Sequence, residues 1–312
     1  MYDLIGDIHG HATELKALLS RLGYEEKDGV WQHPERQVIF LGDFIDRGPE
    51  QIESVQIPMR MVQKGHALAV MGNHEFNAIA WAKPDQNNPD EHLRPHTDKN
   101  RNQHKAFLEA VGEGSSMHDQ FVEWFEQLPF YLDLPGLRVV HACWHPDHIE
   151  QIQPSLDAKQ RPLSQSWQQL THKETDVFEA AEVLLKGLEI PLPAGYEFAD
   201  KEGNPRTHIR TEWWNLNGTT YSDLAMVPER EGHKIPDEPV PENILPGYDQ
   251  EKPVFVGHYW LRGTPELLAD RIACLDYSIG VKSSGSEKGC KLVAYRWQGE
   301  ADLNSQHFVW VD

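Results

Sequence analysis

Short apolar runs alternate with segments of helical spacing along the first third of the chain. The runs at 38–41 and 67–71 are continuous rather than interrupted by polar residues, which is typical of buried strands. Strands are therefore expected at residues 2–5, 38–41 and 67–71. Helices are expected after them, at residues 15–22, from near Pro49, and at 74–81.

The middle of the chain has a less regular pattern. Residues 83–101 are rich in Pro, Asn and Asp and are expected to form a loop. Apolar residues at helical spacing predict a helix around 121–128, and a strand is expected at 137–142. From 146 to 253 the chain is polar and dotted with proline, with one helical segment at 176–188 and few strand signals.

The last part of the chain returns to strand patterns. A strand is expected at residues 253–258, followed by successive antiparallel strands at 271–275, 291–297 and 308–311. Alternation of strand, loop and helix predicts an α/β fold built in layers. We expect a single domain over residues 1–312, in which 146–253 is a polar insertion or cap that covers one end of the sheet.

The composition is strongly acidic. The 312 residues include 29 Lys and Arg against 49 Asp and Glu, which gives a formal net charge of −20. Because such a surface repels phosphate backbones and anionic headgroups, nucleic acids and membranes are not expected partners. No apolar run is long enough to cross a bilayer. The charge also counts against a polyanionic substrate, unless the pocket itself is electropositive.

The spacing of the cysteines indicates their redox state and the cellular location of the protein. Cys143, Cys274 and Cys290 are far apart and form no CxxC pair, so they are expected to be reduced thiols. The first residues show no basic segment followed by a long apolar run, as a secretory signal would. A cytoplasmic location is therefore expected.

Side chains of the metal-binding type stand at the ends of the predicted strands. They are Asp7 with His9, Asp43, Asn73, His141 and His258. Since ligands collect beyond the carboxyl ends of strands in α/β sheets, these residues are expected to converge on one or two divalent ions. If Asp43 bridges two ions, Asp7 and His9 complete one site. Asn73, His141 and His258 then complete the other. Such an ion pair can activate water for in-line attack on phosphorus.

Three ordered motifs carry a resemblance to a known family. The segments GDIHG at 6–10, GDFIDRG at 42–48 and GNHE at 72–75 resemble the signature of the phosphoprotein-phosphatase branch of the calcineurin-like metallophosphoesterases. The later segments VHA at 140–142 and VGH at 256–258 fit the places of this family's remaining histidine ligands. The resemblance implies a layered α/β/β/α metallophosphoesterase sandwich and two divalent metal ions, Mn²⁺ first, with Fe, Zn or Mg as alternatives.

The resemblance also implies roles for residues that need not touch a metal. Arg47 would bind phosphate oxygens through the fork of donors on its guanidinium. His74 would protonate the leaving oxygen, oriented by Asp46. A second phosphate-binding arginine is expected between the last two histidines, with Arg210 as the candidate and Arg206 as the alternative.

The function implied is hydrolysis of phosphate monoesters by attack of a metal-bridging hydroxide. The substrate would be a protein phosphorylated on serine, threonine or tyrosine, or a small phosphate ester. The alternative is a dinucleoside polyphosphate hydrolase of the symmetrical bis(5′-nucleosyl)-tetraphosphatase type. A non-catalytic scaffold is disfavoured because such a protein would be expected to lose ligands or the general acid.

Two smaller alternatives stay open at this point. His145 and His148 suggest a separate zinc site, although the spacing lacks partner cysteines and helical periodicity. Trp213 and Trp214 are expected to pack in the core rather than to stack on substrate.

Overall fold

The first of two β-sheets contains the N-terminal strands. The computed structural model describes residues 1–200, 203–241, 244–284 and 289–312. The strand order is β15-β16-β1-β4-β5, with β17 paired to β16. The strands are β1 (Tyr2–Ile5), β4 (Gln37–Phe40), β5 (Ala67–Ala69), β15 (Asp276–Tyr277), β16 (Lys291–Trp297) and β17 (Phe308–Val311). β1, β4 and β5 run parallel, whereas β16 is antiparallel to β1, β15 and β17.

The second sheet has the order β14-β13-β7-β6. Its strands are β6 (Tyr131–Asp133), β7 (Arg138–Val140), β13 (Val254–Val256) and β14 (Ile272–Cys274). β13 runs parallel to both β7 and β14, so the expectation of an antiparallel strand at 271–275 is wrong. The physical reason is the connection over residues 257–271, which is long enough for the crossover that a parallel partner requires.

The two sheets pack face to face, because neighbouring residues on each strand point to opposite sides. Leu4, Ile39, Val139 and Phe255 belong to one buried cluster, which contains side chains of both sheets. Their neighbours along the strands, such as Ile5, belong to a second cluster that also contains the buried faces of the helices. This alternation gives the order helix, sheet, sheet, helix, and the predicted α/β sandwich is confirmed.

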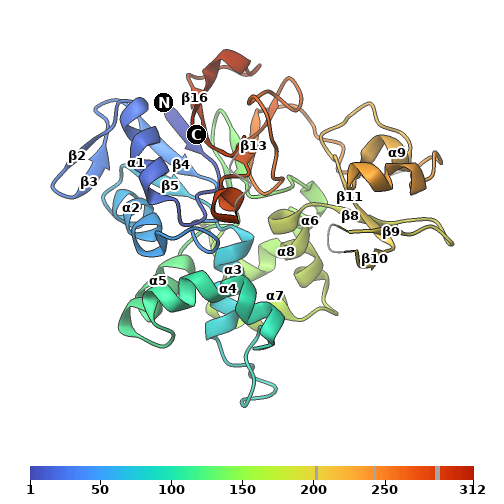
Figure 1. Cartoon of the computed structure of the whole chain (residues 1–312), viewed down its shortest axis with the longest axis horizontal. Helices are drawn as coiled ribbons and strands as arrows, with labels where there is room; N and C mark the ends of the chain where they lie inside the picture. The colour runs from blue at the N-terminus through green and yellow to red at the C-terminus, as the bar shows by residue number, and fades with distance from the viewer. Residues whose placement is uncertain (201–202, 242–243, 285–288) are drawn as a thin grey trace.

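The helices of the first half lie where their apolar faces meet the sheets. They are α1 (Ala12–Arg21), α2 (Gln51–Gln63), α3 (Asn73–Ala82), α4 (Asp98–Val111) and α5 (Ser116–Phe125). Figure 1 shows α1 and α2 beside β4 and β5. The expected helices near 15–22, Pro49, 74–81 and 121–128 are confirmed within a few residues at their ends.

Helix α4 is absent from the expectations drawn from the sequence. Its buried residues are His104, Phe107, Leu108 and Val111, which recur at helical spacing. The stripe begins with a histidine, and the first turns are otherwise polar, so the apolar pattern is too short to predict a helix. The expected loop at 83–101 therefore ends at the start of α4, where the Thr97 hydroxyl accepts a hydrogen bond from the Asn100 N–H.

The segment from 146 to 253 contains more regular structure than its polar sequence indicates. It forms a three-stranded sheet in the order β12-β11-β8 and a two-stranded pair of β9 and β10. These strands have two to four residues, too few to leave a period-two pattern. Its elements are α6 (Pro146–Ile152), α7 (Trp167–Thr171), α8 (Asp176–Lys186), β8 (Glu189–Pro191), β9 (Phe198–Ala199), β10 (Pro205–Arg206), β11 (His208–Thr211), α9 (Tyr221–Leu224) and β12 (Ala225–Met226).

The remaining elements are short. A hairpin joins β2 (Glu25–Lys27) and β3 (Val30–Gln32), and short 3₁₀-helices lie at Gln153–Ser155, Ser164–Ser166, Glu229–Lys234, Ile279–Ser284 and Ser305–His307. In Figure 1 the strands β8 to β11 and helix α9, in yellow to orange, lie on the opposite side of the molecule from α1 and α2. Over the described ranges of the chain, none of the helices is long and apolar enough to cross a membrane.

Candidate metal centre and active site

The predicted ligands follow strands of both sheets at their carboxyl ends. Asp7 and His9 follow β1, Asp43 follows β4, Asn73 begins α3 shortly after β5, His141 follows β7 and His258 follows β13. Because β1, β4 and β5 are parallel, as are β7 and β13, these ends lie at a common edge of each sheet. This edge is where an α/β sheet presents its ligand site.

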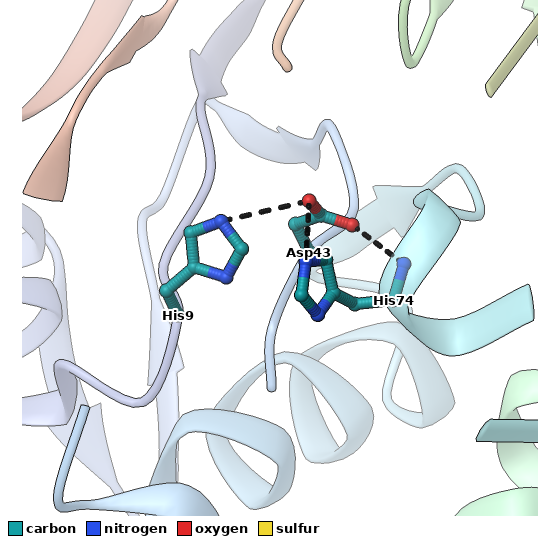
Figure 2. Close-up of side chains that lie close together, drawn as sticks. All are labelled: His9, Asp43 and His74. Atoms are coloured by element: carbon teal, nitrogen blue, oxygen red, sulfur yellow. Dashed lines mark hydrogen bonds and ion pairs between the residues drawn. The ribbon is translucent and has the colours of Figure 1, made fainter. Parts of the chain in front are cut away.

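Asp43 lies at the centre of the cluster. Its Oδ2 atom lies 3.5 Å from His9 Nε2 and 3.4 Å from His141 Nε2. Figure 2 shows His9 and His74 on either side of this carboxylate. His74 Nε2 is 3.9 Å from Asp43 Oδ2, and the His74 backbone N–H donates to Oδ1 at 3.0 Å. Asp43 is thus shared by two groups that could each hold an ion: His9, Asp43 and His74, and Asp43, His141 and His258.

Asn73 and Asp7 complete the neighbourhood. The Asn73 Oδ1 atom lies 3.2 Å from His141 Nε2 and 2.8 Å from His258 Nδ1. The Asp7 Oδ2 atom accepts a hydrogen bond of 3.0 Å from the His258 backbone N–H. The structure therefore brings the predicted ligands together, and it places His74, expected only as an acid, within reach of the first group as well.

Several buried atoms of the cluster have no hydrogen-bond partner within the described part of the chain, and they fit a bound cation. They are Asp7 Oδ1, His9 Nε2 and His258 Nε2. His9 Nδ1 donates to the Ile45 carbonyl at 3.0 Å, so Nε2 carries the lone pair of the neutral ring. Burial lowers the pKa of His9 to about 4, which keeps this ring neutral at physiological pH. Carboxylate, amide oxygen and neutral imidazole are ligands that suit divalent ions.

The electrostatics of the cluster also favour a cation. Burial, followed by the nearby Asp276 carboxylate, raises the pKa of Asp7 well above its usual range. Burial opposes protonation of His141, but the charge and hydrogen bond of Asp43 outweigh it and raise the pKa of His141 to about 10. The buried carboxylates thus attract positive charge, which a divalent ion would supply directly.

His74 is the end of a hydrogen-bonded chain that includes a histidine not expected from the sequence. His74 Nδ1 donates to Asp46 Oδ2 at 2.6 Å, and His104 Nδ1 donates to Asp46 Oδ1 at 2.9 Å. Burial opposes ionisation of Asp46, but His104 and His74 outweigh it and hold the pKa of this carboxyl well below its usual range. The only sequence signal for His104 is its place in the stripe with Phe107 and Val111.

Glu75 joins two of the loops that carry ligands. Its carboxylate accepts hydrogen bonds from the backbone N–H groups of Asp43 and Phe44, both at 2.8 Å, and of Gly72 at 3.1 Å. Burial, followed by the Asp43 charge, raises the pKa of Glu75 to about 7. Gly72 is required at this junction, because a Cβ atom there would lie 2.2 Å from Asp43 Oδ1.

The backbone of the cluster is strained. His9, Asp43, Asp46, Arg47 and His258 have φ angles of 46°, 51°, 68°, 74° and 70°. These values lie in the left-handed region, which residues other than glycine seldom adopt. Strain of this kind persists only where the surrounding structure enforces it, and it gathers at functional sites.

A cavity of about 670 Å³ lies beside the cluster, and arginines line it. Arg47 reaches it with its guanidinium 4.7 Å from the centre of the Trp260 ring. Arg210 and Arg206 also line it, paired with Glu189 at 3.1 Å and with Asp200 at 2.9 Å. Burial, followed by the charge of Arg210, lowers the pKa of His258 well below its usual range.

The structure bears on the packing role expected for the tryptophans and on the separate zinc site suggested by His145 and His148. Trp213 is buried, and its Nε1 donates to the Ala142 carbonyl and to the Tyr259 hydroxyl, which supports a packing role. His145 and His148 lie in edge contact, with ring centres 4.3 Å apart. Within the described residues, neither belongs to the two groups that could hold an ion.

The chain belongs to a known family. The family model for calcineurin-like phosphoesterases matches residues 2–200, and this match confirms the resemblance found in the sequence. The expected enzyme class, a metal-dependent hydrolase of phosphoric esters, agrees with this family.

Its curated relatives carry a narrower name. The chain is 32% identical over 149 residues to the asymmetrical bis(5′-nucleosyl)-tetraphosphatase PrpE of Oceanobacillus iheyensis, a match that covers 47% of this chain and 57% of the relative. It is 35% identical over 153 residues to the protein of the same name from Bacillus subtilis, covering 47% of this chain and 59% of the relative. The matched part thus spans less than two thirds of either relative.

A solved structure shares the fold. The chain resembles a protein serine/threonine phosphatase from Saccharomyces cerevisiae, described as similar to human phosphatase PP5, with a TM-score of 0.52. The sequence identity is 13%, and the match covers 99% of this chain and 78% of that chain. At this identity the similarity concerns the fold alone.

Proposed function

We propose that this protein hydrolyses phosphate esters or anhydrides with two divalent metal ions. The observation that carries the proposal is the group of side chains around Asp43, which adjoins an arginine-lined cavity. The ions would be held by Asp7, His9, Asp43, Asn73, His141 and His258, with Mn²⁺ as the first metal to test. When bound, such ions activate water near neutral pH and offset the negative charge of phosphate.

The chain's own residues would bind the substrate and move the proton. Arg47 and Arg210, which both line the cavity, bind the phosphate oxygens. His74 protonates the leaving oxygen through Nε2, since its Nδ1 is engaged by Asp46. Asp46 fixes the orientation of the ring. Burial opposes protonation of His74, but the charge of Asp43 and then the hydrogen bond and charge of Asp46 outweigh it and raise the pKa of His74.

We infer that the substrate is a dinucleoside polyphosphate that is cleaved asymmetrically. The names of the curated relatives support this choice over the symmetrical reaction. The cavity supports it as well, because Phe198, Met226 and Trp260 line it together with the arginines, although three carboxylates also line it. An apolar wall beside cationic groups suits a nucleoside attached to phosphate. In this proposal, residues 146–253 form a cap, since β11 and β12 line the cavity.

Hydrolysis of phosphorylated proteins is the competing prediction. The two can be separated by assaying the chain, stripped of metal and reloaded in turn with Mn²⁺, Fe²⁺, Zn²⁺ or Mg²⁺, against diadenosine tetraphosphate, phosphopeptides and p-nitrophenyl phosphate. Four phosphates can divide as one and three or as two and two, so ion-exchange separation of the products distinguishes the asymmetrical from the symmetrical reaction. A kcat/KM that is orders of magnitude higher for phosphopeptides would refute the proposed substrate.

A control separates hydrolysis by this site from contamination. Asp43→Asn removes one negative charge and one ligand oxygen from the centre of the cluster while it keeps the shape of the side chain. Activity that survives this change in the Mn²⁺-loaded protein would refute the proposed site.

A further inference from the structure

A second cavity adjoins the candidate active site on the side of α4. It has a volume of about 570 Å³ and is lined by Arg47, by Glu109, and by Lys99, Gln103 and Lys105 among others of α4. Arg47 also lines the larger cavity formed with the inserted segment. One residue of the candidate active site therefore borders both cavities.

The charge of this second cavity is opposite to that of the whole protein. Arg47, Lys99 and Lys105 face a single lining carboxylate, Glu109, which lies 3.6 Å from Lys105. Within the described ranges, no carboxylate lies within ion-pair distance of Lys99. On a chain whose formal net charge is −20, such a group of cations is a local site for anions.

Helix α4 links this cationic face to the candidate proton donor. Lys99, Gln103 and Ala106 recur at helical spacing and so share the outer face of the helix. His104, on the buried face, donates to Asp46, which in turn binds His74. The cationic face and the group that would protonate the leaving oxygen are thus supported by the same element.

We propose that the outer face of α4 binds the anionic leaving portion of a polyphosphate substrate. This inference rests on the proposed function. The nucleoside next to the attacked phosphorus lies in the larger cavity, and the remaining phosphates extend past Arg47 onto Lys99 and Lys105. Water forms the new P–O bond, and the bridging P–O bond breaks with the electron pair and a proton going to the departing triphosphate portion. Asymmetrical cleavage then follows from the difference between the two cavities.

The test removes the two lysines and keeps the candidate active site. The variant Lys99→Gln/Lys105→Gln is compared with Lys64→Gln/Lys173→Gln, which makes the same change in net charge at exposed positions outside both cavities. Inorganic tripolyphosphate is titrated into the metal-free proteins by calorimetry. We expect about tenfold weaker binding for the α4 variant, since each exposed ion pair contributes up to about 1 kcal/mol, and no change for the control.

Kinetics of the metal-loaded proteins give the second readout. The KM for diadenosine tetraphosphate is expected to rise about tenfold in the α4 variant, and the kcat/KM for p-nitrophenyl phosphate, which lacks distal phosphates, to stay unchanged. Added salt should weaken the binding of tripolyphosphate to the native protein more than its binding to the α4 variant.

The outcomes separate this inference from the function on which it rests. Equal tripolyphosphate affinity in the two double variants would overturn the α4 site. A loss confined to acidic phosphopeptides would also overturn it and would assign the face to a peptide. If tripolyphosphate binding depends on the lysines but no substrate is hydrolysed with any metal, the anion site stands and the proposed function fails.

Discussion

Replacement of His104 tests whether the chain of hydrogen bonds through Asp46 controls the candidate acid. His104→Leu removes the 2.9 Å hydrogen bond to Asp46 Oδ1 and leaves the carboxylate with its 2.6 Å bond to His74. A hydrogen bond to a charged group contributes about 1.5–3 kcal/mol. If the whole loss appears in the transition state, kcat falls by about ten- to hundredfold.

The size of the decrease in kcat should depend on the leaving group of the ester. Esters with a poor leaving group, such as phenyl phosphate, need the proton from His74 and should show the full decrease in kcat. p-Nitrophenyl phosphate, whose leaving group needs little protonation, should change little. His104→Asn keeps an N–H donor near the position of Nδ1 and should restore most of the rate.

A double-mutant cycle separates positioning from general destabilisation. His104→Leu should have little further effect in a His74→Asn background, because the group that it orients is gone. Metal content, measured by atomic emission, should stay at the native level in both single variants. Equal losses of kcat for both esters, or additive losses in the double variant, would refute the reasoning and leave His104 with a structural role.

Four further substitutions test other parts of the site and His145, a buried histidine outside the groups that could hold an ion. Asp43→Asn should lower the metal content of both sites, measured after dialysis, and reduce kcat/KM by at least about a hundredfold. Retention of both ions would contradict the shared role of Asp43. Arg210→Ala should reduce kcat/KM by about ten- to hundredfold if it binds phosphate, whereas Arg206→Ala should change it less than about threefold, and the reverse order would assign the role to Arg206. Burial lowers the pKa of His145 to about 4, so the unfolded chain binds more protons between about pH 6.5 and 4. Stability should therefore fall over that interval as the pH drops, by about 1–2 kcal/mol from this group, and a His145→Gln variant should show a weaker dependence in denaturant titrations at each pH.

The positions of the main strands along the chain and the residues at their ends could be predicted from the sequence because both are local signals. The continuous apolar run at 38–41 followed by Gly-Asp at 42–43, for example, indicates where a strand ends and which side chain follows it. The parallel pairing of β14 could not be predicted, since it depends on the path of residues 257–271 rather than on the composition of the strand. Which residues serve as ligands and which arginine binds phosphate are still predictions.

The role of His104 and the second cavity could not be predicted for a different reason. The place of His104 in the short stripe with Phe107 and Val111 indicates only that it is buried. Its role depends on the hydrogen bond to Asp46, which the sequence does not show. Lys99 and Lys105 are ordinary exposed lysines in the sequence, and only Arg47 on the neighbouring loop gives them a cavity to face.

The left-handed backbone of the cluster has a consequence for how this protein withstands chelation. A residue in that region costs of the order of 1–3 kcal/mol. The summed strain of the five residues in the cluster is therefore comparable to a typical free energy of unfolding of about 5–15 kcal/mol. Ions that bind only the folded chain would offset this cost by mass action. The temperature of unfolding should therefore rise with free metal concentration. Because the ligands follow strands of both sheets, bound ions would stabilise the packing of the two sheets in addition to their role in hydrolysis.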